Sequence, residues 1–331
     1  MPSSNEPRML YRLANPRGHF DGGAAVNVRN PWICRIPAAP LRQRSGDRPG
    51  GRSIPLLFGA LMFVGSLLLI TPYAARAAER AVDLELVLAA DISDSMDLAE
   101  ANLQRAGIIG AIRHPLVIRA IQRGQLGRIA VSYVEWAGAG HQRTIVGWAE
   151  ISDAASAAAF AAAIQGQSLN TAIWTSISTA IEFAARGFEG NGYTGQRRII
   201  DISGDGPNNH GNHVVFARDR AIGAGITING LAIVNDRLSP YGFPPLPDLD
   251  LYYQDCVIGG PGAFLVIADG FADFARAIRR KLLLEIAGAV APAPLLWRAT
   301  ARARPPCDAG EQQLRGWNAD VDWGARAPFR Q

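Results

Sequence analysis

Short apolar runs alternate with segments of helical spacing between residues 82 and 289, and this alternation constrains the fold more than any other feature. The expected strands are 84–90, 128–136, 144–148, 198–203, 226–234 and 264–268. Strands that alternate with helices form a mainly parallel sheet, because each helix carries the chain back to the start of the next strand. The run 144–148 differs, since a Gly-rich turn joins it to the preceding strand and favours a hairpin. We therefore predict an α/β domain with one antiparallel edge strand.

The net charge of +4 is unevenly distributed along the 331 residues. Residues 1–80 hold 11 arginines against 4 acids, whereas residues 81–290 hold 16 basic residues against 21 acids. The predicted domain is therefore mildly acidic, which argues against a nucleic-acid partner. An apolar content of 48% is sufficient for a large core.

The N-terminal region predicts export. The segment from Ile54 to Ile70 is a run of 17 residues without charge, and an Arg-rich stretch precedes it. Ala75-Arg76-Ala77 then fits a small-x-small cleavage site, so 54–77 is interpreted as a signal peptide that directs the chain to the periplasm. The alternative is a membrane anchor facing the periplasm, because the run nearly reaches the ~18–20 residues that span a bilayer.

The two ends of the sequence lack periodicity. Residues 1–53 are rich in Arg, Pro and Gly and are interpreted as a disordered leader or a wrongly assigned start. Residues 290–331 contain Ala, Pro and Arg with scattered Trp, which predicts a disordered tail. The three cysteines lie far apart and only Cys256 falls inside the predicted domain, so we expect a buried thiol there and no disulfide framework.

Oxygen-bearing side chains follow two of the expected strands. Asp91, Ser93 and Ser95 occupy alternate positions after the strand 84–90, and Asp205 follows the strand 198–203. Thr171, in "SLNTAIWTSI", lies in a loop that is expected to precede a helix. Ligands of open α/β sheets bind beyond the carboxyl ends of the strands, where these residues would meet. An all-oxygen set suits a hard divalent cation such as Mg²⁺, with Ca²⁺ or Mn²⁺ as alternatives.

This Asp-x-Ser-x-Ser series, followed by Thr171 and then by Asp205-Gly206, resembles the metal-ion-dependent adhesion site of von Willebrand factor type A domains. The stretches "DISGDGPNN" and "YYQDCVIGGPGAF" look like the bacterial DUF1194 family within that superfamily. The resemblance covers about 82–289 and implies a Rossmann-like, doubly wound fold. The sequence departs from the motif where Asn170 replaces the glycine that usually precedes the threonine, and where Trp174 replaces a small residue.

The resemblance also implies roles for the site residues. Ser93 and Ser95 would contact the metal directly, Thr171 directly or through water, and Asp91 and Asp205 mostly through water. A Glu or Asp carboxylate of a partner protein would then complete the coordination shell. The expected function is an exported, metal-dependent protein-binding domain and not an enzyme.

Several alternatives stay open at this stage. Asp91, Ser93 and Ser95 alone would also suit a strand end and a helix N-cap, since both residue types favour caps. Asp201 is a second carboxylate near Asp205 and is interpreted as a buried structural acid, paired with an arginine such as Arg198 or hydrogen-bonded to the backbone. His210 is expected to be a solvated loop residue, like His213, but it would be the base if the domain were a metal-dependent hydrolase. A scaffold without metal is the remaining alternative.

Overall fold

The computed structural model describes residues 79–240, 242–288 and 302–320, with side chains up to residue 316. The predicted leader (1–53) and the signal or anchor segment (54–77) lie outside the described residues. No helix among the described residues is long and apolar enough to cross a membrane.

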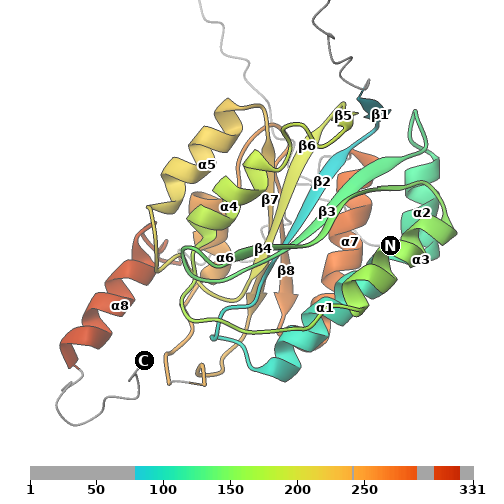
Figure 1. Cartoon of the computed structure of the whole chain (residues 1–331). Coiled ribbons are helices and arrows are strands. Elements are labelled where there is room, and N and C mark those ends of the chain that lie inside the picture. The colour runs from blue at the N-terminus through green and yellow to red at the C-terminus, as the bar shows by residue number, and fades with distance from the viewer. Residues whose placement is uncertain (1–78, 241, 289–301, 321–331) are drawn as a thin grey trace, which may run out of the picture. The chain divides into compact units, whose positions relative to one another are not determined.

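A six-stranded sheet forms the centre of the domain, in the strand order β4-β3-β2-β6-β7-β8 (Figure 1). Its strands are β2 (Glu85–Asp91), β3 (Ile129–Trp136), β4 (Gln142–Ile151), β6 (Arg198–Gly204), β7 (Thr227–Val234) and β8 (Leu265–Asp269). All neighbours are parallel except β3 and β4, which are antiparallel at the edge. The predicted α/β class with one antiparallel edge strand is confirmed. Two short strands, β1 (Arg80–Val82) and β5 (Tyr193–Gly195), pair separately.

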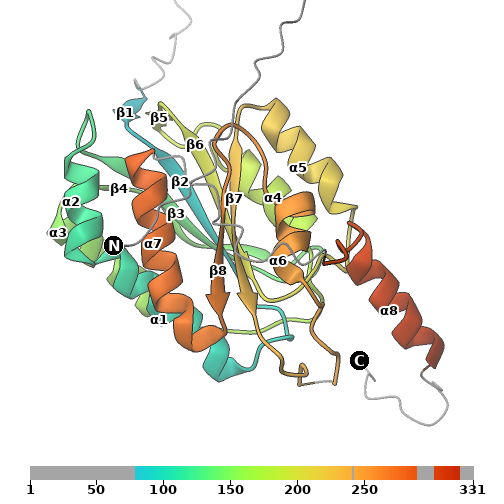
Figure 2. The same cartoon turned by 180° about the vertical axis from the view of Figure 1, so that it is seen from behind.

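Helices cover both faces of this sheet (Figures 1 and 2). One face carries α1 (Leu98–Ile112), α2 (Pro115–Gln122), α3 (Ala154–Gln165), a 3₁₀ turn η2 (Phe271–Asp273) and α7 (Phe274–Ala287). The other carries α4 (Ile177–Arg186), α5 (Val214–Gly223), α6 (Leu249–Tyr252) and the π-helix η1 (Tyr253–Val257). Successive side chains of a strand point to opposite faces, so Leu86 and Leu88 of β2 join the first core whereas Val87 and Ala89 join the second. The doubly wound arrangement is thereby confirmed, and it explains why β2 is apolar between its terminal residues Glu85 and Asp91.

A buried charge cluster fixes α7 to the sheet. The ammonium of Lys281, the one lysine of the sequence, lies 2.6 Å from Asp201 Oδ2 and 2.7 Å from Glu285 Oε1. Asn229 Nδ2 also donates to Glu285 Oε1, at 2.9 Å. Burial, only partly offset by Lys281, raises the pKa of Asp201 to about 7. Asp201 is therefore a buried structural acid as expected, but its partner is Lys281 and not an arginine.

Part of the region predicted as a disordered tail is structured, so this prediction is wrong for residues 302–320. Cys307 forms a disulfide with Cys256, 51 residues away, and α8 (Ala309–Asp320) follows it. The expectation of a free thiol at Cys256 is also wrong. Both errors have the same physical reason. Tertiary contacts hold the segment 302–320 in place, and such contacts leave no periodic pattern in the sequence of the segment.

Substitution of Asp201 by asparagine is expected to weaken the pH dependence of folding stability. The folded-state pKa of about 7 lies above the ordinary value of 3.8, so the folded protein keeps a proton that the unfolded chain loses between these values. The contribution of Asp201 to stability is therefore complete below about pH 4 and is lost as pH rises towards 7. Urea unfolding in EDTA at pH 5 and pH 7 should show a smaller fall in the free energy of unfolding for Asp201→Asn than for wild type. Equal falls would mean that Asp201 stays ionised in the folded protein.

Candidate metal site

Two neighbouring parallel strands end together and bring four of the predicted residues to one edge of the sheet. Asp91 is the last residue of β2, and Asp205 directly follows β6. The register of the two strands pairs Ala90 with Ser203, so their carboxyl ends lie side by side. Ser93 and Ser95 stand in the turn between β2 and α1. The position is the one at which open α/β sheets bind ligands.

Short hydrogen bonds connect these four side chains. The backbone N–H of Ser93 donates to Asp91 Oδ1 at 2.7 Å, and the hydroxyl oxygens of Ser93 and Ser95 are 3.0 Å apart. Ser95 Oγ donates to Asp205 Oδ1 at 2.6 Å. Asp91 and Ser93 are fully buried and Asp205 is 7% exposed. The arrangement is a buried cluster of oxygen atoms with two carboxylates at its centre.

The structure brings Thr175, and not Thr171, to this cluster. Thr175 is buried and its hydroxyl donates to Ser93 Oγ at 3.3 Å, whereas the side chain of Thr171 is exposed. The error arose at the helix boundary, because α4 begins at Ile177 and not near Thr171. Ser176 caps α4 by accepting from the amide of Thr179. The signal that could have found Thr175 in the sequence was its place directly before Ser176, a serine suited to cap the helix.

Trp174 has a left-handed backbone conformation, with φ of 69°. Non-glycine residues rarely adopt this region, which costs about 1–3 kcal/mol and is found preferentially at functional sites. Trp174 directly precedes Thr175, at the position where the resembled motif has glycine. If Thr175 is the threonine of the motif, Trp174 and not Asn170 stands in place of its glycine. The ring of Trp174 lies 5.9 Å from that of His210.

Both carboxyl groups of the cluster have raised pKa values. Burial is the largest cause in each case, and it raises the pKa of Asp205 to about 6. The pKa of Asp91 is raised well above its ordinary value by burial and next by the neighbouring charge of Asp205. Neither carboxylate forms an ion pair with an arginine or lysine of the described chain. Within the part of the chain that the structure describes, the two carboxylates thus have no ion-pair partner of positive charge.

One oxygen of Asp91 is left without a partner. Asp91 Oδ2 and the hydroxyl of Tyr253, both buried, have no hydrogen-bond partner among the described residues. An ideal Cβ on Gly204 would lie 2.8 Å from each of these two oxygens, so only glycine permits their approach to the strand. A buried, unsatisfied carboxylate oxygen fits a cation, and the hydroxyl oxygens around it fit a hard one. The described residues contain no group of three or more His, Cys, Asp or Glu suited to a metal, so an ion here would depend on the hydroxyls.

Asn208 and Asn209 position the threonine loop, and the sequence analysis did not identify them. Asn209 Oδ1 accepts from the amide of Thr175 at 2.8 Å, and the amide of Asn209 donates back to the carbonyl of Thr175 at 2.8 Å. Asn208 Oδ1 accepts from the amide of Ser178 at 3.0 Å. Their proximity to Asp205 in "GDGPNN" was the signal that could have found them.

The two histidines lie outside the hydrogen bonds of the cluster. His210 is exposed, and its Nδ1 accepts from the amide of Ala139 at 3.0 Å. His213 is the N-cap residue of α5 and is half-buried, with a buried Nδ1, so the expectation of a solvated loop residue is wrong for it. The expectation that His210 is a loop histidine agrees with its exposure. Its ring stabilises the neighbouring loop by accepting the hydrogen bond from Ala139.

The fold and the oxygen cluster define an α/β domain with a candidate cation site at the carboxyl edge of its sheet. Residues 81–290 match the family model described as protein of unknown function (DUF1194), so the chain belongs to this family. The resemblance inferred from "DISGDGPNN" and "YYQDCVIGGPGAF" is thereby confirmed. No curated protein gives a significant match.

Several solved structures are similar to the chain at low identity. Proximal thread matrix protein 1 from the mussel byssus is 12% identical with a TM-score of 0.46, over 63% of this chain and 49% of its own, so the match spans about half of that protein. BatB from Bacteroides thetaiotaomicron is 23% identical (TM-score 0.41; 62% and 100% covered). A von Willebrand factor type A protein from Catenulispora acidiphila is 16% identical (TM-score 0.43; 62% and 43% covered). Similarity at this level carries no conclusion about function.

Replacement of Gly204 by alanine is expected to destabilise the fold by about 1–3 kcal/mol, because the new methyl group would overlap Asp91 Oδ2 and the Tyr253 hydroxyl. Gly110→Ala in α1 is the matched control, since a Cβ there meets nothing within 4 Å and alanine favours a helix. Urea unfolding in EDTA measures both variants. A Gly204→Ala protein as stable as wild type would show that the base of the site is not closely packed.

Proposed function

We propose that this protein is an exported, metal-dependent protein-binding domain. Asp91, Ser93, Ser95, Thr175 and Asp205 would hold a divalent cation, Mg²⁺ first and Ca²⁺ or Mn²⁺ as alternatives. The single observation that carries the proposal is the buried oxygen cluster. Its two carboxylates form no ion pair with a cation of the described chain, and Asp91 Oδ2 has no hydrogen-bond partner among the described residues. Thr175 takes the role that the sequence motif suggested for Thr171.

The residues of the site would have different roles in holding a cation. Asp91 and Asp205 supply negative charge, and the hydroxyls of Ser93, Ser95 and Thr175 supply neutral oxygen atoms within hydrogen-bond distance of one another. The bound cation would supply positive charge to attract a carboxylate from outside. Because Mg²⁺ takes six ligands and keeps several waters, a site with few direct protein ligands leaves a position for a Glu or Asp of a partner protein.

The disulfide between Cys256 and Cys307 supports the export of the chain. Disulfides persist in oxidising compartments such as the periplasm and are rare in the cytosol. This chemistry agrees with the signal peptide or periplasm-facing anchor expected at 54–77. A periplasmic location is therefore part of the proposal. In its alternative form, the segment 54–70 stays in the membrane and tethers the domain on the periplasmic side.

The two alternatives receive less support from the geometry. A hydrolase would need a base beside the ion. The backbone amide of His210 donates to the carbonyl of Thr175 at 3.2 Å, but the described contacts of its imidazole are with the Ala139 amide and the Trp174 ring. A scaffold without metal would keep two buried carboxylates without a compensating charge. We propose no reaction for this site.

Thr175→Val is expected to weaken Mg²⁺ binding at least tenfold, because valine keeps the shape of threonine and removes its hydroxyl oxygen. Thr171→Val is the matched control and should bind within threefold of wild type, since Thr171 is exposed. Calorimetric titration with Mg²⁺ and Mn²⁺ measures both. A larger loss in Thr171→Val would restore the assignment made from the sequence alone.

Asp91→Asn is expected to have opposite effects on stability with and without metal. In EDTA at pH 8 the variant should unfold at a higher temperature than wild type, because it removes a buried charge that no cation of the described chain offsets. Mg²⁺ at 100 times its Kd should stabilise wild type by about 2.7 kcal/mol and leave the variant unchanged. Thermal unfolding in the two buffers provides the measurement. Equal stabilisation of both proteins by Mg²⁺ would contradict the site.

A further inference from the structure

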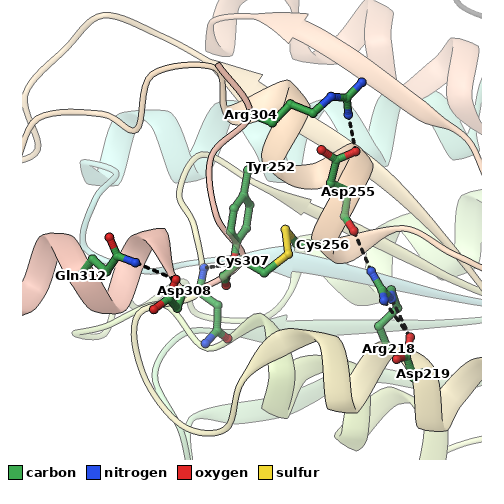
Figure 3. The surroundings of a disulfide bond; sticks show 10 residues. Arg218, Asp219, Tyr252, Asp255, Cys256, Arg304, Cys307, Asp308 and Gln312 are labelled. Atoms are coloured by element: carbon green, nitrogen blue, oxygen red, sulfur yellow. Dashed lines mark hydrogen bonds and ion pairs between the residues drawn. A yellow bond between two sulfur atoms is a disulfide. The ribbon is translucent and has the colours of Figure 1, made fainter. Parts of the chain in front are cut away.

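The C-terminal residues 302–316, here called the clasp, are held against the domain by a covalent bond and ion pairs (Figure 3). The disulfide joins Cys307 to Cys256 in η1. Arg302 pairs with Asp250 at 2.6 Å and Arg304 pairs with Asp255. Exposed ion pairs contribute little on their own, so the disulfide is the main attachment of the clasp.

The clasp contacts the loop that follows β6, next to the candidate metal site. Asn208 in this loop is fully buried, and its Nδ2 donates to Glu311 Oε1 at 2.8 Å. An ideal Cβ on Gly310 would lie 2.1 Å from the carbonyl oxygen of Asn208 and 3.0 Å from Cγ of Pro207. The first turn of α8 therefore lies directly on the backbone of this loop, and Gly310 is required for the contact.

Two sets of hydrogen bonds, joined by the peptide bond between Asn208 and Asn209, connect the clasp to the threonine of the site. Glu311 accepts from Asn208 Nδ2, and Asn208 Oδ1 accepts from the amide of Ser178. The adjacent Asn209 accepts from the amide of Thr175, whose hydroxyl donates to Ser93 Oγ. The orientation of the Thr175 loop thus depends on two asparagines. The side chain of one of them, Asn208, is oriented by Glu311 together with the carbonyl of Asn212, to which Asn208 Nδ2 also donates at 3.1 Å.

Tyr252 and Tyr253, where α6 meets η1, contact both the clasp side and the metal-site side of these hydrogen bonds. Tyr252, directly before η1, accepts from the amide of Asn208 at 3.1 Å and donates to the carbonyl of Cys307 at 3.4 Å. Tyr253 lies beside Asp91, since both side chains come within 2.8 Å of the same point on Gly204. The short stretch 252–256 therefore touches the loop, the clasp and the carboxylate at the end of β2.

We propose that the clasp preorganises the cation site, with Glu311 and Gly310 as positioning residues, and that reduction of the Cys256–Cys307 disulfide loosens the site. In the reduction, a dithiol such as dithiothreitol cleaves the S–S bond, becomes a cyclic disulfide and leaves two thiols on the protein. The part that concerns cation affinity rests on the proposed function. The part that concerns the rigidity of the Thr175 loop does not, because the hydrogen bonds exist in the chain itself.

The test is hydrogen exchange of residues 172–180 in the full chain, measured in EDTA and followed by calorimetric titration with Mg²⁺. Glu311→Ala, the Cys256→Ser/Cys307→Ser double variant and the dithiothreitol-reduced wild type should each exchange at least tenfold faster in this segment and bind Mg²⁺ at least fivefold more weakly. Glu311→Gln should behave as wild type, because its amide oxygen can still accept from Asn208. Gln312→Ala is the matched control, since Gln312 contacts Asp308 within the clasp.

The outcomes separate the two proposals. If wild type binds Mg²⁺ while Glu311→Ala, the double cysteine variant and the reduced wild type keep both protection of 172–180 and affinity, the clasp proposal is overturned alone. If wild type binds no Mg²⁺ but the released proteins lose protection, the rigidity inference stands and the proposed metal function falls. Protection of 85–91 in β2 serves as the internal reference. Loss of protection there to the same degree would mean global destabilisation and would overturn the positioning role.

Discussion

The parallel pairing of β2 with β6 is the interaction on which the rest of the structure depends. β2 is buried on both faces, with Leu86 and Leu88 in one core and Val87 and Ala89 in the other. A strand in this position must be apolar along its length, so polar residues are admitted only where it ends. Because β6 runs beside it in the same direction, the residues after both strands reach the same edge. The position of Asp91 beside Asp205 follows from this pairing and not from any local motif.

Sequence reasoning succeeded where the physical constraint is local to a strand and failed where it is tertiary. The strand and helix alternation, the antiparallel edge and the grouping of Asp91, Ser93, Ser95 and Asp205 all follow from buried strands and their ends. Thr175 was missed because its place depends on the start of α4, which lies at Ile177 and not near Thr171. The left-handed backbone of Trp174, shortly before this helix, is maintained against its cost by contacts from other parts of the chain.

The C-terminal region illustrates the same limit more strongly. Its composition has no period, and three cysteines give no spacing rule that selects one pair. The segment 302–316 is ordered by what it contacts, namely Cys256, Asp250 and Asn208, none of which lies near it in the sequence. Lys281 is a comparable case, since a buried lysine is recognised only when the carboxylates around it are known.

The strand β6 offers an internal comparison that bears on the candidate site. It carries Asp201, and Asp205 follows directly after it, so one short stretch presents two buried carboxylates. Asp201 meets the ammonium of Lys281 at 2.6 Å, and this pair with Glu285 fixes α7 to the sheet. Asp205 accepts from the Ser95 hydroxyl and lies close to a second carboxylate, Asp91, with no ion pair to a lysine or arginine of the described chain. Burial of like charges without compensation is costly. The chain neutralises Asp201 with Lys281 but leaves Asp91 and Asp205 together at the edge of the sheet without a cation of the described residues. This contrast favours a compensating cation from solution at that edge.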